Sequence, residues 1–89
     1  MKITEVKVYP IKDDSKLKAY ATVVFDGCFI IRDLKIIEGE KGLFVSMPSR
    51  RMKDGSFRDI VHPLNTEMRS TIELAVVNEY KKSGPAEIV

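Results

Sequence analysis

The hydrophobic pattern of this chain changes its period once, at His62-Pro63-Leu64. Before that point, apolar residues alternate with polar ones in short runs, which is typical of β-strands. After it, they recur every three or four residues, which is typical of an amphipathic helix. Strands followed by a helix belong to the α+β class. The sequence therefore predicts an antiparallel sheet of about five strands followed by one C-terminal amphipathic helix.

The predicted strands cover residues 3–9, 17–25, 28–37, 43–47 and 57–61, with a polar turn at 12–16. Alternation is clearest from Leu17 to Phe25, and Asp26-Gly27 follows at once. This dipeptide is a strong hairpin signal, because a type I′ turn needs positive φ at both central residues. Strict alternation along 28–37 leaves both faces of that strand largely apolar, which predicts a strand packed on both sides.

The helix is predicted to begin at an N-cap on Asn65 or Thr66 and to end before Gly84-Pro85. Leu74 and Val77 fall off its apolar stripe, either simply exposed or in contact with a partner. The stripe consists of Met68, Ile72, Ala75, Val76 and Tyr80.

One helix is too narrow to cover the predicted sheet. Strands spaced about 4.8 Å apart make a five-stranded sheet roughly 24 Å wide, whereas a helix covers about 10 Å. Large exposed apolar surfaces mark interaction sites, and a second copy related by a twofold axis is a common cover. We therefore expect a homodimer.

Length and composition indicate the number of domains and the cellular compartment. At 89 residues the chain is expected to form one domain, residues 1–89. No apolar run approaches the ~20 residues that span a bilayer, so no membrane partner is expected. The alternating start does not resemble a signal peptide. The single Cys28 excludes an internal disulfide and favours a reducing compartment, so we expect a cytoplasmic protein.

Catalytic and metal-binding patterns are not evident. Cys28 is more typical of a small core side chain than of a nucleophile, and His62 of a local hydrogen bond than of a base. Asp33 is more simply interpreted as a carboxylate paired with a cation across the sheet. One Cys and one His do not supply a zinc site, and phosphate-binding glycine loops are absent. The sequence predicts a protein that is not an enzyme, with no catalytic residues, metal or cofactor.

A basic hairpin between residues 49 and 58 is the feature with the sharpest functional interpretation. Its cations are Arg50, Arg51, Lys53 and Arg58, against the single acid Asp54. The resulting +3 exceeds the net charge of +2 of the whole chain. Arginine offers forked donors that match phosphate, so these four residues are the candidate nucleic-acid-binding site. The alternative is an ordinary solvated turn.

Two phenylalanines lie near this hairpin. Phe44 and Phe57 have rings that are able to stack on bases, but their places on predicted strands favour the core.

The chain resembles the stage V sporulation protein G (SpoVG) family, also called septation proteins, over nearly its whole length. The resemblance is carried by the opening residues 1–6, by residues 31–39, and above all by the continuous block from Gly42 to Asn65 with Met47-Pro48-Ser49-Arg50-Arg51 at its centre.

The resemblance implies a sheet followed by a C-terminal helix, dimerisation, and binding of DNA and RNA in a regulatory role in septation and sporulation. It places Arg50 and Arg51, and Lys53 by position, on the nucleic acid. Members often have Thr-Pro where this chain has Met52-Lys53, so this loop is expected to be less rigid and more basic. The alternative function is a protein–protein interaction module of the division or sporulation machinery, acting through an uncovered sheet or helix face.

Overall fold

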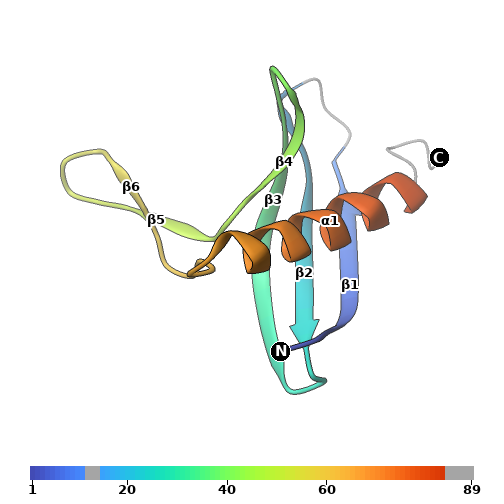
Figure 1. Cartoon of the computed structure of the whole chain (residues 1–89). Helices are drawn as coiled ribbons and strands as arrows, with labels where there is room; N and C mark the ends of the chain where they lie inside the picture. Colours follow the sequence, from blue (N-terminus) through green and yellow to red (C-terminus); the bar gives the residue numbers. More distant parts are fainter. Residues whose placement is uncertain (12–14, 84–89) are drawn as a thin grey trace.

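The computed structural model describes residues 1–11 and 15–83. It contains a four-stranded antiparallel sheet in the order β1-β2-β3-β4, a separate two-stranded ribbon, and one helix (Figure 1). The α+β class is therefore confirmed. Residues 12–14 of the predicted turn and the predicted stop at Gly84-Pro85 lie outside the described residues. The elements are β1 (Ile3–Pro10), β2 (Leu17–Phe25), β3 (Phe29–Gly39), β4 (Gly42–Ser46), β5 (Ser49–Arg51), β6 (Phe57–Asp59) and α1 (Thr66–Ser83).

The segment predicted as a fifth strand of the sheet, residues 57–61, instead supplies β6 of the ribbon. The chain leaves the sheet after β4, at Met47-Pro48. Proline has no amide hydrogen to donate to a ladder, which favours the end of a strand there. The main sheet therefore has four strands, and the ribbon projects away from it.

The turn between β2 and β3 forms as predicted. Asp26 and Gly27 have φ values of 52° and 64°, and the amide of Cys28 donates to the carbonyl oxygen of Phe25 at 3.0 Å. Both positive φ values are those of a type I′ turn. Cys28 is exposed in this turn rather than buried in the core, and β3 begins at Phe29.

Strict alternation along β3 was wrong, because a β-bulge interrupts it. Ala21 pairs with Leu34 and Val23 with Ile31, so two residues of β3 oppose the single Thr22. The bulge lets Ile31 and Leu34 point into the same core, although they are three residues apart. Asp33 has a φ of 64° here, a conformation that Asp tolerates better than most residues.

The ion pair predicted for Asp33 is not observed. The two ion pairs among the described residues join Lys7 to Glu5 and Lys18 to Glu38. Asp33 is exposed, and its structural role is to adopt the positive φ that the bulge requires.

Helix α1 crosses one face of the sheet and contacts β1, β2 and β4 (Figure 1). Asn65 is its N-cap, because the side-chain oxygen of Asn65 accepts the amide hydrogen of Met68 at 2.8 Å. Leu74 is exposed as predicted, whereas Val77 packs against the core. The core consists of Ala19, Ala21, Val23, Phe25, Ile31, Leu34, Ile36, Val45, Met47, Ile72, Val76 and Tyr80.

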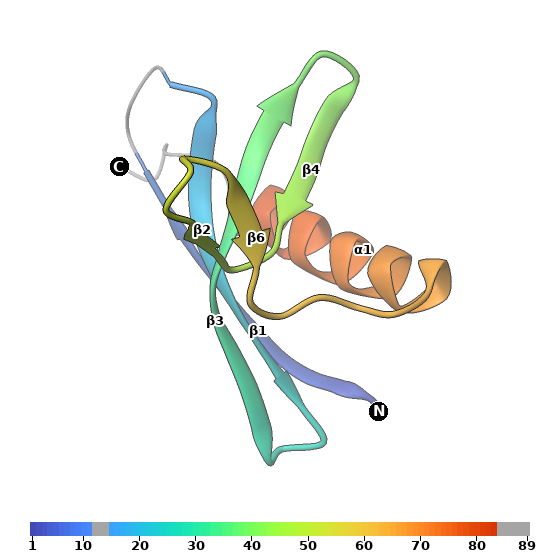
Figure 2. The ribbon, with the colours of Figure 1, turned by 90° about the vertical axis from the view of Figure 1, so that its left-hand side faces the viewer.

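The second face of the sheet carries no helix within the described part of the chain, and we call it the open face. Figure 2 shows α1 on one side of β1–β4 only. Large side chains lie exposed on this face, with 53% exposure for Tyr9 and 43% for both Ile30 and Phe44. Phe44 is therefore not the core residue that the sequence favoured. No helix within residues 1–11 and 15–83 is long and apolar enough to cross a membrane.

Candidate nucleic-acid interface

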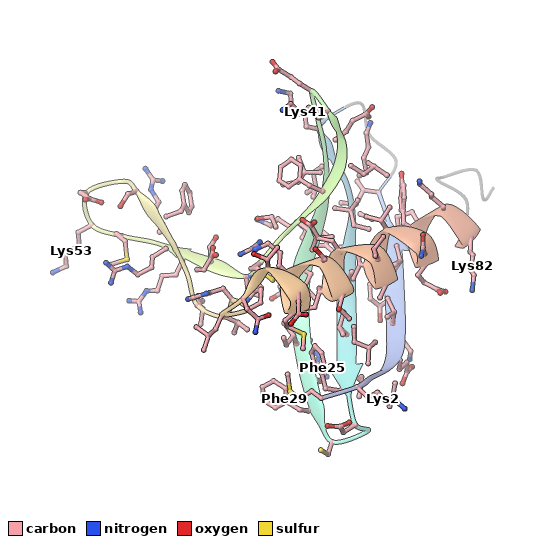
Figure 3. The ribbon with its side chains drawn as sticks, viewed as in Figure 1. Lys2, Phe25, Phe29, Lys41, Lys53 and Lys82 are labelled. Atoms are coloured by element: carbon pink, nitrogen blue, oxygen red, sulfur yellow. The ribbon has the colours of Figure 1, made fainter. Side chains whose placement is uncertain are left out.

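The four predicted site residues all lie on the projecting ribbon, residues 49–59, which we call the arm. Figure 1 shows the arm extending from the sheet beyond β4, away from α1, and in Figure 2 it lies in front of the sheet. Arg50 and Arg51 lie on β5, Arg58 on β6, and Lys53 in the turn between them. All four side chains are exposed. In Figure 3 Lys53 marks the tip of the arm, at the opposite end of the molecule from Lys82.

The turn at the tip fixes the register of the arm. The amide of Gly55 donates to the carbonyl oxygen of Met52 at 3.0 Å, and the amide of Met52 donates to the carbonyl oxygen of Ser56 at 2.7 Å. Gly55 has a φ of 91°, a conformation in which any side chain is strained. Glycine here lets the chain reverse, and every later pairing in the arm follows from this register.

Asp54, the single acid of the predicted hairpin, has a structural role at the tip. Its carboxylate accepts the hydroxyl hydrogen of Ser56 at 2.6 Å and the amide hydrogen of the same residue at 3.0 Å. The hydroxyl contact, followed by the amide contact, lowers the pKa of Asp54 below its ordinary value. The carboxylate therefore orders the turn.

The register places Arg50 directly opposite Arg58. Residues that oppose each other across two strands share one face of the ribbon, so both guanidinium groups project from the same face. Like charges in this position destabilise a strand pair. Among the residues that the structure describes, neither arginine forms an ion pair. The arm thus holds two uncompensated cations side by side, the arrangement that an anion such as phosphate would stabilise.

The other face of the arm is chemically different. Arg51 opposes Phe57, and Ser49 opposes Asp59. One cation and one carboxylate make this face neutral, and the phenyl ring of Phe57 is 69% exposed on it. The preference for a core position was therefore wrong for Phe57 too. Asp54-Gly55 is a turn signal in the sequence that could have indicated this register, since a turn centred there aligns residue 51 with residue 57.

A shallow groove of about 450 Å³ lies where the arm joins the sheet. Pro48, Ser49 and Ile60 line it from the base of the arm, and Tyr20, Asp33 and Lys35 line it from the sheet. The amide of Ile60 donates to the carbonyl oxygen of Pro48 at 2.8 Å, which closes the base of the arm. Lys35 therefore adds a cation within the groove at the foot of the arm.

The residues considered for catalysis remain apart from the arm. Cys28 is exposed in the β2–β3 turn. Nδ1 of His62 lies 3.1 Å from the carbonyl oxygen of the next residue, Pro63, which is the local hydrogen bond that the sequence favoured. The contact of His62 is therefore with the backbone of the adjacent residue.

Comparison with known proteins identifies the family of this chain. The SpoVG family model matches residues 1–82. A protein of Bdellovibrio bacteriovorus is 56% identical over 82 residues, which is 92% of this chain and 75% of that protein. A protein of Myxococcus xanthus is 51% identical over 82 residues, covering 92% of this chain and 82% of its own length. One from Acholeplasma laidlawii is 47% identical over 98% of this chain and 93% of its own length. Each is named as a candidate septation protein SpoVG. On both grounds, the chain belongs to the SpoVG septation protein family.

Proposed function

We propose that this chain is a homodimeric regulatory protein of the septation and sporulation type that binds DNA or RNA phosphates with its arm, in the cytoplasm and without catalysing a reaction. The observation that carries the proposal is the Arg50–Arg58 pair, two exposed cations that face each other without an acid between them. A phosphate bound between them would accept hydrogen bonds from both guanidinium groups and relieve their mutual repulsion.

The remaining cations extend this contact. Lys53 at the tip and Arg51 on the opposite face add two further exposed cations to the arm. Contacts of this kind hold the nucleic acid backbone and carry no base specificity by themselves. The groove at the foot of the arm, with Lys35, offers the strand a further cation.

Dimerisation is supported by the open face. Tyr9, Tyr20, Ile30 and Phe44 are exposed on it, with exposed fractions of 38% or more. A second copy packed there would bury these side chains, since a twofold interface covers the same patch on both partners. The dimer would then present two arms, and two weak contacts joined in one body bind more tightly than either alone.

The test removes the opposed pair and keeps the fold. In the variant Arg50→Ala/Arg58→Ala, two phosphate contacts are lost. If the electrostatic part of binding vanishes near 1 M salt, affinity at 0.1 M should fall about 25-fold for single strands and about 60-fold for duplexes. Fluorescence anisotropy of labelled oligonucleotides measures this. Tm should not fall, because both side chains are exposed and their removal relieves the repulsion between them.

The matched control is Lys81→Ala/Lys82→Ala, which removes the same charge from the end of α1, far from the arm. Its affinity should stay near that of the parent. Equal loss in both variants would assign binding to net charge rather than to the arm. Wild-type protein that binds no oligonucleotide at low salt would contradict the proposal.

The second candidate is a protein–protein interaction module acting through an uncovered surface. Leu74 on α1 is 64% exposed, and the open face carries the apolar residues described above. Binding of a division or sporulation protein through α1 would be lost in Leu74→Glu, and binding through the open face would be lost in Phe44→Glu. Neither would change in Arg50→Ala/Arg58→Ala. Binding with the opposite sensitivity supports the arm.

A further inference from the structure

Phe57 is an aromatic ring placed in solvent in the middle of a cationic arm. It is 69% exposed, and it is neither in the core nor among the partly buried residues packed against the core. A strand phenylalanine ordinarily buries its ring, whereas this one leaves it in solvent. The ring is therefore free to contact a ligand.

The neighbours of Phe57 suggest which ligand. Arg51 stands directly opposite, with Cβ atoms about 4.5–5.5 Å apart in such pairs. Next along the same face are Ser49 and Asp59, so the face is neutral overall. The Arg50 face carries the net positive charge and therefore attracts phosphate more strongly. The Phe57 face offers a flat π surface with a guanidinium beside it, which suits a planar base.

We infer that Phe57 stacks on an unpaired base and that the arm therefore binds single-stranded nucleic acid, or single-stranded segments, in preference to duplex. The inference rests on the proposed function and adds the class of ligand to it. Bases inside a duplex are already stacked on each other and expose only their edges in the grooves. A ring gains a stacking partner only where a base is unpaired. Because every base has a π face, this contact tolerates any sequence.

The two faces of the arm then bind different parts of the nucleic acid. Arg50 and Arg58 hold the phosphates from one face, while Phe57 accepts a base on the other. Phe57 and Arg58 are consecutive in β6 and project to opposite sides. A strand running along the β6 edge meets both side chains within about one nucleotide.

The chain contains no tryptophan and three tyrosines, so Phe57→Trp introduces a single indole at the proposed stacking position, which can be excited selectively at wavelengths that tyrosine does not absorb. Addition of oligo(dT) should quench its emission, because a stacked base quenches an indole ring. The matched control is Leu74→Trp, at a site of similar exposure on α1, 64% against 69%. Its emission should not change when the same fraction of protein is bound. The anisotropy of the labelled oligonucleotide measures that fraction.

Affinity provides the second readout. Phe57→Ala should weaken binding to oligo(dT) about 5- to 150-fold, the range for loss of one stacked base, and leave binding to a blunt duplex of equal length unchanged. Phe57→Tyr keeps the π surface and should restore the affinity.

Three outcomes would overturn the inference. If emission of the Phe57→Trp variant and affinity of Phe57→Ala both stay constant while Arg50→Ala/Arg58→Ala abolishes binding, the proposed function stands and the stacking role fails. If Phe57→Ala dissociates the protein in sedimentation and weakens both ligands equally, the ring is a subunit contact. If the wild type binds no nucleic acid, the proposed function fails and the inference with it.

Discussion

Replacing Arg58 with glutamate puts a carboxylate directly across the arm from Arg50, where two cations now face each other. Opposed pairs of opposite charge stabilise a strand pair by about 0.2–1 kcal/mol, and like charges destabilise it by similar amounts. Replacing a repulsive pair with an attractive one should therefore stabilise the arm by about 0.4–2 kcal/mol. Because both side chains are exposed, we expect the lower half of that range, about 0.4–1 kcal/mol.

Native-state amide hydrogen exchange measures this difference locally. The amide of Met52 donates within the arm at 2.7 Å and that of Ile60 donates to Pro48 at its base at 2.8 Å, so both exchange when the arm opens. At 1.4 kcal/mol per factor of ten, their exchange should slow about two- to fivefold in Arg58→Glu. Nucleic acid binding should fall in the same variant. The arm would thus become more stable as it loses its ligand.

The control is Arg51→Glu, which makes the same change in charge on the other face of the arm. Arg51 opposes Phe57 rather than a cation, and Asp59 lies nearby on the same face. No repulsion is relieved there, so exchange at Met52 and Ile60 should not slow. Equal slowing in both variants, or none in Arg58→Glu, would refute the claim that the Arg50–Arg58 pair is strained in the free protein.

The fold itself supports three further predictions. Asn65→Ala removes the oxygen that accepts the Met68 amide at 2.8 Å, so it should cost about 0.5–2 kcal/mol and lower Tm by at least a few degrees; an unchanged Tm would exclude Asn65 as the cap. Leu34→Ala empties a fully buried site next to the bulge and should cost about 2–5 kcal/mol in denaturant unfolding, whereas a cost under about 0.5 kcal/mol would be that of a surface site. Ser56→Ala removes the first cause of the lowered pKa of Asp54, so that pKa should rise in an NMR titration. Since the folded pKa is depressed, the stability that Asp54 contributes to the turn is present above its unfolded pKa and is lost as pH falls through the folded pKa. A pKa that stays low in Ser56→Ala would contradict the assignment of the shift to the Ser56 hydroxyl.

Much of the fold could be predicted because local patterns and tertiary packing agree. The bounds of β2 follow from alternation and the type I′ turn from Asp26-Gly27, and the cap of α1 is Asn65, one of the two candidates Asn65 and Thr66. In each case, backbone preferences and burial favour the same conformation.

Prediction was wrong where one residue changes the register. A single extra residue at Asp33 moves Leu34 onto the same face as Ile31, and alternation gives no warning of a bulge. The composition of 57–61 is typical of a strand, but sequence does not say which neighbour a strand pairs with. Phe57 was therefore expected in the core, because its pairing with Arg51 outside the main sheet depends on where the chain leaves β4.

The candidate site could be located but not arranged from the sequence. All four cations, Arg50, Arg51, Lys53 and Arg58, lie on the arm as composition indicated. Their division between two faces depends on the register set by the turn. That division is what distinguishes a phosphate site from an evenly charged loop.

The central claim, that the arm binds nucleic acid through phosphates, is tested most directly by the salt dependence of oligonucleotide affinity. Four contacts to a single strand predict a slope of log affinity against log salt of about −2.8 for each arm, and Arg50→Ala/Arg58→Ala should reduce it to about −1.4. Anisotropy titrations across a salt series give both values. A slope near zero in the wild type, or an unchanged slope in the variant, would contradict the account.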